Sequence, residues 1–190
     1  MSQARQRLTV EQEPFLVVRS FACGYSSGHC IEPHQHDWHQ LLYACTGAMT
    51  VHAGRLSWMI PPGKAVFIPA GCSHSIRMWG AVAMRSLAFP AAVAGPALAV
   101  EECHVLSVTP LLRELILRVI AMPALDSRVP AHQRLLGVLL DEMSVAPVAP
   151  LVLPLPVDHQ LQFVLDDRPE SQKTALSQNC QPHATRRMRR

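Results

Sequence analysis

Three histidines and a glutamine form the most chemically distinctive pattern in this sequence. His34, His36 and Gln40 are separated by even numbers of residues, and His74 follows a Pro-Ala-Gly turn further along the chain. Alternate residues of an extended strand face the same side, so a strand through this segment would present His34, His36 and Gln40 together. Imidazole nitrogens and an amide oxygen brought together in this way could bind Zn, Fe, Mn or Ni.

The same side chains permit two further interpretations. They could hydrogen-bond an organic ligand without any metal, or they could simply pack as structural residues. Gln40 is a neutral and weak metal ligand, which favours the metal-free site. We predict a ligand-binding site made of His34, His36, Trp38, Gln40 and His74. No cofactor is certain from the sequence, and a divalent metal on His34, His36, Gln40 and His74 stays a hypothesis.

Short apolar segments separated by Gly and Pro turns must position these residues. The expected strands are Phe15–Phe21, His39–Cys45, Met49–His52, Leu56–Ile60, Ala65–Ile68, Ser73–Met78 and Val82–Phe89. Breaks are expected at Cys45-Thr46-Gly47, Ala53-Gly54-Arg55, Pro61-Pro62-Gly63, Pro69-Ala70-Gly71 and Trp79-Gly80. Many short strands with such turns favour a β-sandwich or barrel over a βαβ fold.

Two segments resemble the two sequence motifs of the cupins. The first contains His34, His36 and Gly47, with Gln40 where cupins often have Glu. The second runs from Gly63 through the Pro-Ala-Gly turn to His74. The resemblance implies a fold that is mainly β with α, in which residues 1–100 form a cupin-like barrel (a double-stranded β-helix) and the histidines meet at its mouth.

The sequence around these motifs is more specific than that of a generic cupin. The runs PHQHDWHQLLYACTGAMTV, WMIPPGKAVFIPAGCSHSIRMWG, LSVTPLLRELILRVI and RLLGVLLDEM closely resemble the N-terminal domain of AraC-type transcriptional regulators, and the likeness covers residues 11–158. It implies a domain that senses a small-molecule effector and dimerises. The alternative is a small cupin metalloenzyme of the dioxygenase or isomerase type, which Gln40 in place of Glu disfavours, so we expect no enzymatic activity.

A helix pair is predicted over residues 101–145. Thr109-Pro110 is a helix start, because Thr supplies a capping hydroxyl and Pro suits the first helical position. A second helix is expected from Pro130. The family resemblance implies that these helices dimerise the protein, and packing within one chain is the alternative. The expected dimerisation residues are Leu111, Leu112, Leu115, Ile116, Leu136 and Leu139.

The rest of the chain is expected to lead towards a DNA-binding part. Residues 146–157 are Pro-rich and predict an extended linker. Residues 158–190 contain too few apolar positions for a complete helix-turn-helix, which needs a packed core to present its recognition helix. We therefore expect an incomplete remnant, so that DNA is a partner only if this segment is functional. The chain would act as a homodimer or as a heterodimer with a full-length relative.

Composition adds only broad limits. The formal net charge of +3 is too small to indicate nucleic-acid binding by itself. Residues 1–10 are polar and lack the apolar segment of a signal peptide. The apolar residues 81–100 are interrupted by Arg85, Pro90 and Pro96, which argues against a membrane span. The six cysteines have no CxxC spacing, and we expect reduced thiols in a cytoplasmic protein.

Overall fold

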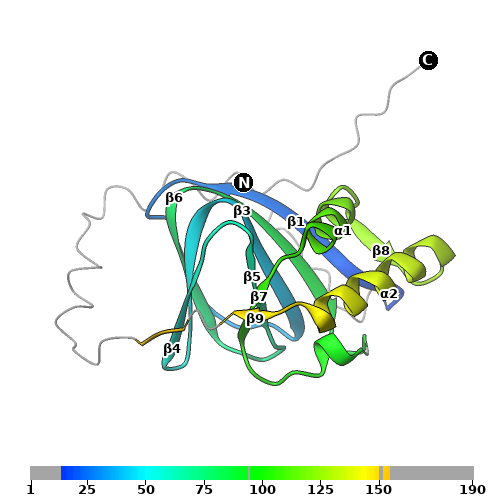
Figure 1. Ribbon diagram of the computed structural model, residues 1–190. Coiled ribbons are helices and arrows are strands. Elements are labelled where there is room, and N and C mark those ends of the chain that lie inside the picture. The colour runs from blue at the N-terminus through cyan, green and yellow to red at the C-terminus, as the bar shows by residue number, and fades with distance from the viewer. Residues whose placement is uncertain (1–13, 94, 150–151, 155–190) are drawn as a thin grey trace, which may run out of the picture.

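The computed structural model describes residues 14–93, 95–149 and 152–154. Its elements follow one another as β1 (Leu16–Tyr25), β2 (Cys30–His34), β3 (Trp38–Ala53), β4 (Leu56–Ile60), β5 (Lys64–Ile68), β6 (His74–Pro90), η2 (Pro96–Leu98), β7 (His104–Ser107), α1 (Pro110–Ile120), β8 (Ala124–Asp126), α2 (Pro130–Val145), β9 (Val148–Ala149) and β10 (Val152–Pro154). The strands curl into a barrel, and α1 and α2 lie together on one side of it (Figure 1). The fold is thus mainly β with two helices, as the sequence predicted.

The long strand β6 is the centre of one antiparallel sheet. β3 pairs along the whole length of β6, while β1 and then β2 pair with the other edge of β6. The sheet extends from β3 through β5 to β7 and β9, and from β1 to β8, while β4 joins β3 to β10. The chain therefore closes the barrel around two long paired strands, β3 and β6.

Strand β3 separates two apolar cores because its side chains alternate between the two faces. Leu41 and Tyr43 belong to an outer core between the sheet and the helices, which also contains Phe67, Phe89, Leu112, Ile116 and Leu139. Leu42 and Ala44 belong to an inner core inside the barrel, with Met49, Val51, Trp58, Ile60 and Met78. Up to Ala44 the even-numbered residues of β3 therefore face the barrel interior, and beyond the irregularity between Ala44 and Ala48 the odd-numbered ones do.

Helix α1 begins where the sequence predicted. The hydroxyl of Thr109 accepts a hydrogen bond from the backbone N–H of Leu112 at 3.1 Å, and Pro110 is the first helical residue. The buried face of α1 consists of Leu112, Ile116 and Val119, and that of α2 consists of Leu139, Leu140 and Met143. Within the described residues, no helix is long and apolar enough to cross a membrane.

The six residues expected to dimerise the protein fall into two groups. Leu112, Ile116 and Leu139 are fully buried in the outer core, so within one chain they contact the sheet and are not available to a partner. Leu115 and Leu136 pack partly against this core, and Leu111 is 52% exposed. The burial of three of the six supports the alternative of packing within one chain, and dimerisation stays a prediction.

The expected continuous strand from His34 to Gln40 is interrupted. β2 ends at His34 and β3 begins at Trp38. The reason lies in the pairing, because His34 lies opposite His74 at one end of β6 while Trp38 lies opposite Pro90 at the other end. Four residues span about 14 Å at most, so the two ends of β6 must approach each other as that strand curls round the barrel.

At two of the expected strand breaks the structure has no turn. The segments around Gly47 and Gly80 lie inside β3 and β6, which each run through as one strand. The pairing between β3 and β6 shifts register between Ala44 and Ala48, and both glycines have positive φ. Irregularities of this kind bend a strand without ending it. The sequence therefore located the two bends correctly but assigned them to the wrong kind of structure.

The sheet also contains strands in segments that the sequence predicted to be helix or linker. β7 and β8 lie within residues 101–145, expected to be helical, and pair with β5 and β1. β9 and β10 lie in the expected linker and pair with β7 and β4. Pro lacks an N–H but still offers a carbonyl, and the oxygen of Pro147 accepts from the N–H of Ser107 at 2.8 Å. The domain boundaries stay a prediction, and residues 158–190 lie outside the described residues.

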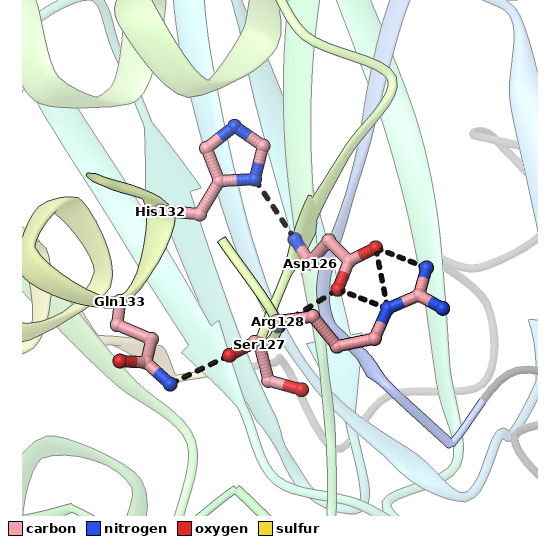
Figure 2. A network of polar contacts seen from close by, with 5 residues as sticks. All are labelled: Asp126, Ser127, Arg128, His132 and Gln133. Atoms are coloured by element: carbon pink, nitrogen blue, oxygen red, sulfur yellow. Dashed lines mark hydrogen bonds and ion pairs between the residues drawn. The ribbon is translucent and has the colours of Figure 1, made fainter. Parts of the chain in front are cut away.

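A polar network stabilises the connection between β8 and α2 (Figure 2). Arg128 contacts the Asp126 carboxylate, with Nη2 and Oδ2 at 2.6 Å, and its hydrogen bonds hold the pKa of Asp126 at about 2. The backbone N–H of Asp126 donates to Nδ1 of His132, and the amide of Gln133 donates to the Ser127 carbonyl. Helix α2 has no side-chain N-cap, so these contacts fix its start instead.

Candidate ligand site at the barrel mouth

His34, His36 and His74 converge at one end of the barrel. His34 is the last residue of β2, His36 lies in the step between β2 and β3, and His74 is the first residue of β6. The ring centroids are 4.3 Å apart for His34 and His74, and 5.1 Å apart for His36 and His74. One ligand atom of each ring lies within 4.8 Å of the others. The curl of β6 brings these histidines together, because it places both ends of that strand beside the same short step of the chain.

Each of the three rings is fixed by a backbone carbonyl two residues away. Nδ1 of His34 donates to Glu32 at 2.8 Å, Nδ1 of His36 to Trp38 at 2.8 Å, and Nδ1 of His74 to Cys72 at 2.9 Å. A carbonyl can only accept, so the proton must lie on Nδ1 in every case. In the neutral rings Nε2 is then left with a free lone pair, which is the form in which an imidazole binds a metal or accepts from a ligand.

His74 provides the most available of these lone pairs. Its side chain is only 2% exposed, and its Nε2 is buried with no hydrogen-bond partner among the described residues. The pKa of His74 is lowered to about 4, mainly by burial and also by the charges of His34 and His36, while the bond to the Cys72 carbonyl opposes the shift. The ring is therefore neutral near pH 7. A buried polar atom without a partner costs free energy, so this nitrogen is suited to a bound group.

Gln40 links this histidine cluster to the barrel interior. Its Oε1 lies 2.9 Å from Nε2 of His36, and its Nε2 donates to the hydroxyl of Ser86 at 2.8 Å. With Nδ1 of His36 bound to a carbonyl, a neutral His36 and the amide oxygen present two lone pairs to the same point. A proton on Nε2, a bound cation or a rotated amide would each remove the repulsion between these two acceptor atoms. Of the three, a cation is the one that uses all the lone pairs of the cluster together.

The parity expectation for the neighbours of Gln40 agrees with their positions. Trp38 stacks on His36 with centroids 4.6 Å apart and 7° between the planes. His39 lies on the other face of β3, where it stacks on Phe67 of the outer core and accepts a bond from the Ala70 N–H. His39 is thus directed away from His34, His36 and His74, as its odd position predicted.

A cavity of about 220 Å³ adjoins the cluster inside the barrel. Its lining consists of Phe21, Cys23, Tyr25, Ile31, His34, Gln40, Ile76, Met84 and Ser86. These residues include no carboxylate, lysine or arginine, and their hydrogen-bonding side chains are those of Tyr25, His34, Gln40 and Ser86. Of the five residues expected to bind an effector, His34 and Gln40 line the cavity, whereas His36, Trp38 and His74 lie beside it.

The sequence alone missed most of this lining. Ser86 had a usable signal, because it is the polar member of the inward-facing series Val82, Met84, Ser86 and Ala88. Phe21, Tyr25 and Ile31 had none, because their positions depend on the pairing of β1 and β2 with β6. The cavity wall opposite Gln40 could therefore be found only from the three-dimensional structure.

Residues 17–143 match the model of a known family, the AraC-like ligand binding domain. This match covers well over half of the chain. The chain belongs to the AraC-like ligand-binding-domain family. The cavity and the histidine cluster described above thus lie within an AraC-like ligand-binding domain, and both fall inside the matched residues.

A curated relative of this AraC-like domain is the HTH-type transcriptional regulator NimR from Escherichia coli (strain K12). The two sequences are 37% identical over 126 residues, which are 64% of this chain and 44% of NimR. The chain therefore spans less than half the length of this relative, and NimR includes a large part that has no counterpart in the alignment.

Solved structures with a similar arrangement are more distant. A cupin superfamily protein from Desulfitobacterium hafniense DCB-2 is 14% identical with a TM-score of 0.38, covering 47% of this chain and 74% of its own. Oxalate decarboxylase from Bacillus subtilis, an enzyme with Mn(II) centres, is 21% identical with a TM-score of 0.38, covering 46% and 25%. ToxT from Vibrio cholerae, solved with an unsaturated fatty acid, is 5% identical with a TM-score of 0.46, covering 56% and 47%.

Proposed function

We propose that the barrel binds a small, uncharged and largely apolar effector, and that this binding regulates a transcription factor of which the chain is the sensing part. The observation that carries the proposal is the cavity of about 220 Å³ with His34 and Gln40 in its wall. The volume is below the 300–1,000 Å³ usual for drug-sized ligands, which favours a molecule of about one ring. The lining has aromatic and aliphatic side chains for the body of this molecule and a polar end for one hydrogen-bonding group.

Filling the cavity tests this proposal. Neutral, anionic and cationic single-ring fragments would be screened against the full chain by ligand-observed NMR, and the affinity of each hit measured by calorimetry. We expect the hits to be mainly neutral, and Ile31→Trp to weaken them by about tenfold or more, the factor that 1.4 kcal/mol of lost contact gives. Leu56→Trp is the matched control, since Leu56 is half-exposed on β4 and does not line the cavity. Equal binding of charged fragments, or unchanged binding to Ile31→Trp, would contradict the proposal.

We further propose that His34, His36, His74 and Gln40 hold a divalent transition metal. The support is the chemistry of the donor set, namely three rings with protonated Nδ1 atoms, a buried Nε2 of His74 without a partner, and an amide oxygen facing His36. Nitrogen-rich sites of this kind suit Zn, Fe, Ni or Mn. Such an ion would supply a Lewis-acidic position for one polar atom of the effector, while the cavity residues orient the rest of the molecule.

Cobalt absorption measures this metal site directly. We expect Co²⁺ added to the chelator-treated protein at pH 7 to give visible d–d bands, and His74→Gln to lose them. His39→Gln should keep the bands, because His39 lies on the opposite face of β3. Identical spectra for wild type and His74→Gln would rule out this donor set, and elemental analysis of untreated protein would identify the ion acquired in the cell.

The site is better suited to binding than to catalysis. A cupin-type hydrolase, isomerase or oxygenase needs an acid or base beside the open metal position. The three histidines of the described cluster would all be metal ligands, and Gln40 stands where the cupin motif often has Glu. We therefore propose that the domain is not an enzyme, and that the effector acts through its different affinity for two arrangements of the regulator.

Dimerisation is proposed through the exposed part of the helix pair. Leu111 is 52% exposed on α1, and Val138 is 46% exposed on α2, so both are accessible to a second copy of the chain or to a full-length relative. We expect Leu111→Glu to reduce the dimer fraction in light scattering while leaving the melting temperature nearly unchanged. Leu56→Glu is a control of similar exposure on β4. A monomeric wild-type protein, or a dimer insensitive to Leu111→Glu, would contradict this surface.

Contact with DNA is assigned to a helix-turn-helix part and not to the barrel. The support for this proposal is the similarity to NimR, an HTH-type transcriptional regulator of which the alignment covers 44%. Residues 158–190, expected to contain an incomplete remnant, lie outside the described residues. A regulator of this kind works in the cytoplasm, which is where we propose that this protein acts.

A further inference from the structure

Two cysteines lie in contact directly beside the histidine cluster. Sγ of Cys72 and Sγ of Cys103 are 3.4 Å apart, although the residues are separated by 31 positions in the sequence. Both side chains are partly buried against the inner core. No part of the effector or metal proposal uses them, and the spacing of the cysteines in the sequence gave no indication of this pair.

The strand pairing explains why these two thiols meet. β5 and β7 are antiparallel neighbours, with Phe67 opposite His104, and Cys103 is the residue just before β7. Cys72 lies in the turn that follows β5, at the same end of this strand pair. Neither cysteine lies within a strand, so the backbone around each can adjust without disturbing the ladder. Bringing the sulfurs from 3.4 Å to the 2.05 Å of a disulfide needs a movement of about 1.4 Å.

We propose that Cys72 and Cys103 form a reversible disulfide that makes the ligand site responsive to oxidants. With a small-molecule disulfide RSSR, the sulfur of Cys72 bonds to one sulfur of RSSR and releases RSH. The sulfur of Cys103 then bonds to that of Cys72 and releases the second RSH. The two hydrogens of the protein thiols leave in the two RSH molecules, so the protein is oxidised by two electrons and RSSR is reduced by two.

The order of these two steps follows from the difference in reactivity between the two thiols. Cys72 lies in the turn after β5, whereas burial, together with the hydrogen bond and the charge of Cys72, raises the pKa of Cys103 to about 12. Cys103 is therefore suited to act second, when a mixed disulfide has already formed beside it. An accessible thiol next to a resolving cysteine is the usual arrangement of a protein thiol sensor.

The turn that carries Cys72 also holds the histidines. The carbonyl of Cys72 accepts from Nδ1 of His74 at 2.9 Å, and the N–H of Gly71 donates to the carbonyl of His36 at 2.7 Å. Any part of the approach of about 1.4 Å between the sulfurs that the Cys72 backbone takes up would move the carbonyl that holds Nδ1 of His74. The oxidised protein should thus have a displaced His74 ring. In that respect the inference rests on the proposed function, since it is the effector and metal site that oxidation would alter.

Peptide mapping of the full chain tests the disulfide itself. Trypsin places Cys72 in the peptide 65–77 and Cys103 in the peptide 86–113, each with a single cysteine. After treatment with oxidised glutathione, we expect these two peptides to be joined, and to separate again with dithiothreitol. Cys72→Ser and Cys103→Ser should each lose the joined species, whereas Cys30→Ser, which removes an exposed cysteine on β2, should retain it. Glutathione that remains on Cys72 without a joined peptide would overturn the proposal.

The effect on the site is followed at the histidine rings. In ¹⁵N-labelled, metal-free protein we expect oxidation to shift the imidazole resonances of His74 in the wild type and in Cys30→Ser, and not in Cys72→Ser. A disulfide without any shift at His74 would refute the link to the ligand site. Neither readout needs an effector or a metal. If the barrel bound no effector or metal, the joined peptide and the shift at His74 would still be observed. If no disulfide formed, the fragment and cobalt experiments would still report on the proposed function.

Discussion

Replacing Gly47 by alanine is expected to destabilise the protein by about 3–4 kcal/mol. Gly47 has φ +69°, and a Cβ there would lie 2.5 Å from the carbonyl oxygen of Ala81 and 2.8 Å from Cγ2 of Val82. The left-handed conformation alone costs an L-residue about 1–2 kcal/mol, and overpacking of a tight site adds about 1–3 kcal/mol. The clash cannot be relieved cheaply, because its nearest atom is backbone of β6, the strand on which the barrel is centred.

Gly54→Ala is the matched control for this change. Gly54 has φ +58°, but no atom lies within 4 Å of the added Cβ, so only the conformational cost of about 1–2 kcal/mol applies. Thermal and urea unfolding of both variants would measure the difference. For a domain of this size 3–4 kcal/mol corresponds to a fall of about 10 °C in melting temperature. Equal losses for the two variants would mean that the close approach of β3 and β6 at Gly47 is not tight.

Lowering the pH from about 6.5 to about 4 should destabilise the metal-free protein through His74. Burial lowers the pKa of this ring from 6.5 to about 4, so in this window the unfolded chain binds the proton and the folded chain does not. The free energy of unfolding therefore rises with pH between 4 and 6.5, and the stabilisation is fully present above pH 6.5. Each unit of pKa shift is worth about 1.4 kcal/mol, and solvent screening reduces the total to about 2 kcal/mol.

Variants separate His74 from the other histidines that titrate in the same direction. Burial also lowers the pKa of His39 and of His52, so part of the pH dependence belongs to them. Chemical unfolding across pH 4–7 would be compared for wild type, His74→Gln and His29→Gln. We expect His74→Gln to have the flatter profile and His29→Gln, at a ring stacked on Tyr25 outside the cluster, to follow the wild type. A wild-type slope in His74→Gln would refute this assignment.

In several parts of this chain the structure depends on short-range interactions, and there the sequence was sufficient to predict it. The hydroxyl of Thr109 and the fixed φ of Pro110 specify a helix start whatever surrounds them. Side-chain alternation along β3 directed Gln40 into the barrel and His39 away from it, because the two-residue period is a property of any extended backbone. His34, His36 and His74 were grouped by their cupin-like motifs, whereas the continuous strand expected from His34 to Gln40 is interrupted between β2 and β3.

Where long-range pairing decided the outcome, the sequence was not sufficient. Glycines at 47 and 80 predict bends, but only the antiparallel partner determines whether a bend ends a strand or continues through it. The same holds for Leu112 and Leu139, whose apolar character fits a dimer interface as well as an internal core. The sheet face beneath them settles that they are buried within one chain.

The candidate ligand site shows both contributions together. Its histidines could be named from their types and spacing, since these residues have few alternatives to coordination or hydrogen bonding. The cavity wall from β1 and β2, the bond from Gln40 to Ser86 and the contact of Cys72 with Cys103 join residues separated by tens of positions. Such contacts exist only because β6 curls until its ends approach each other, and that curvature is a property of the closed sheet and not of any one segment.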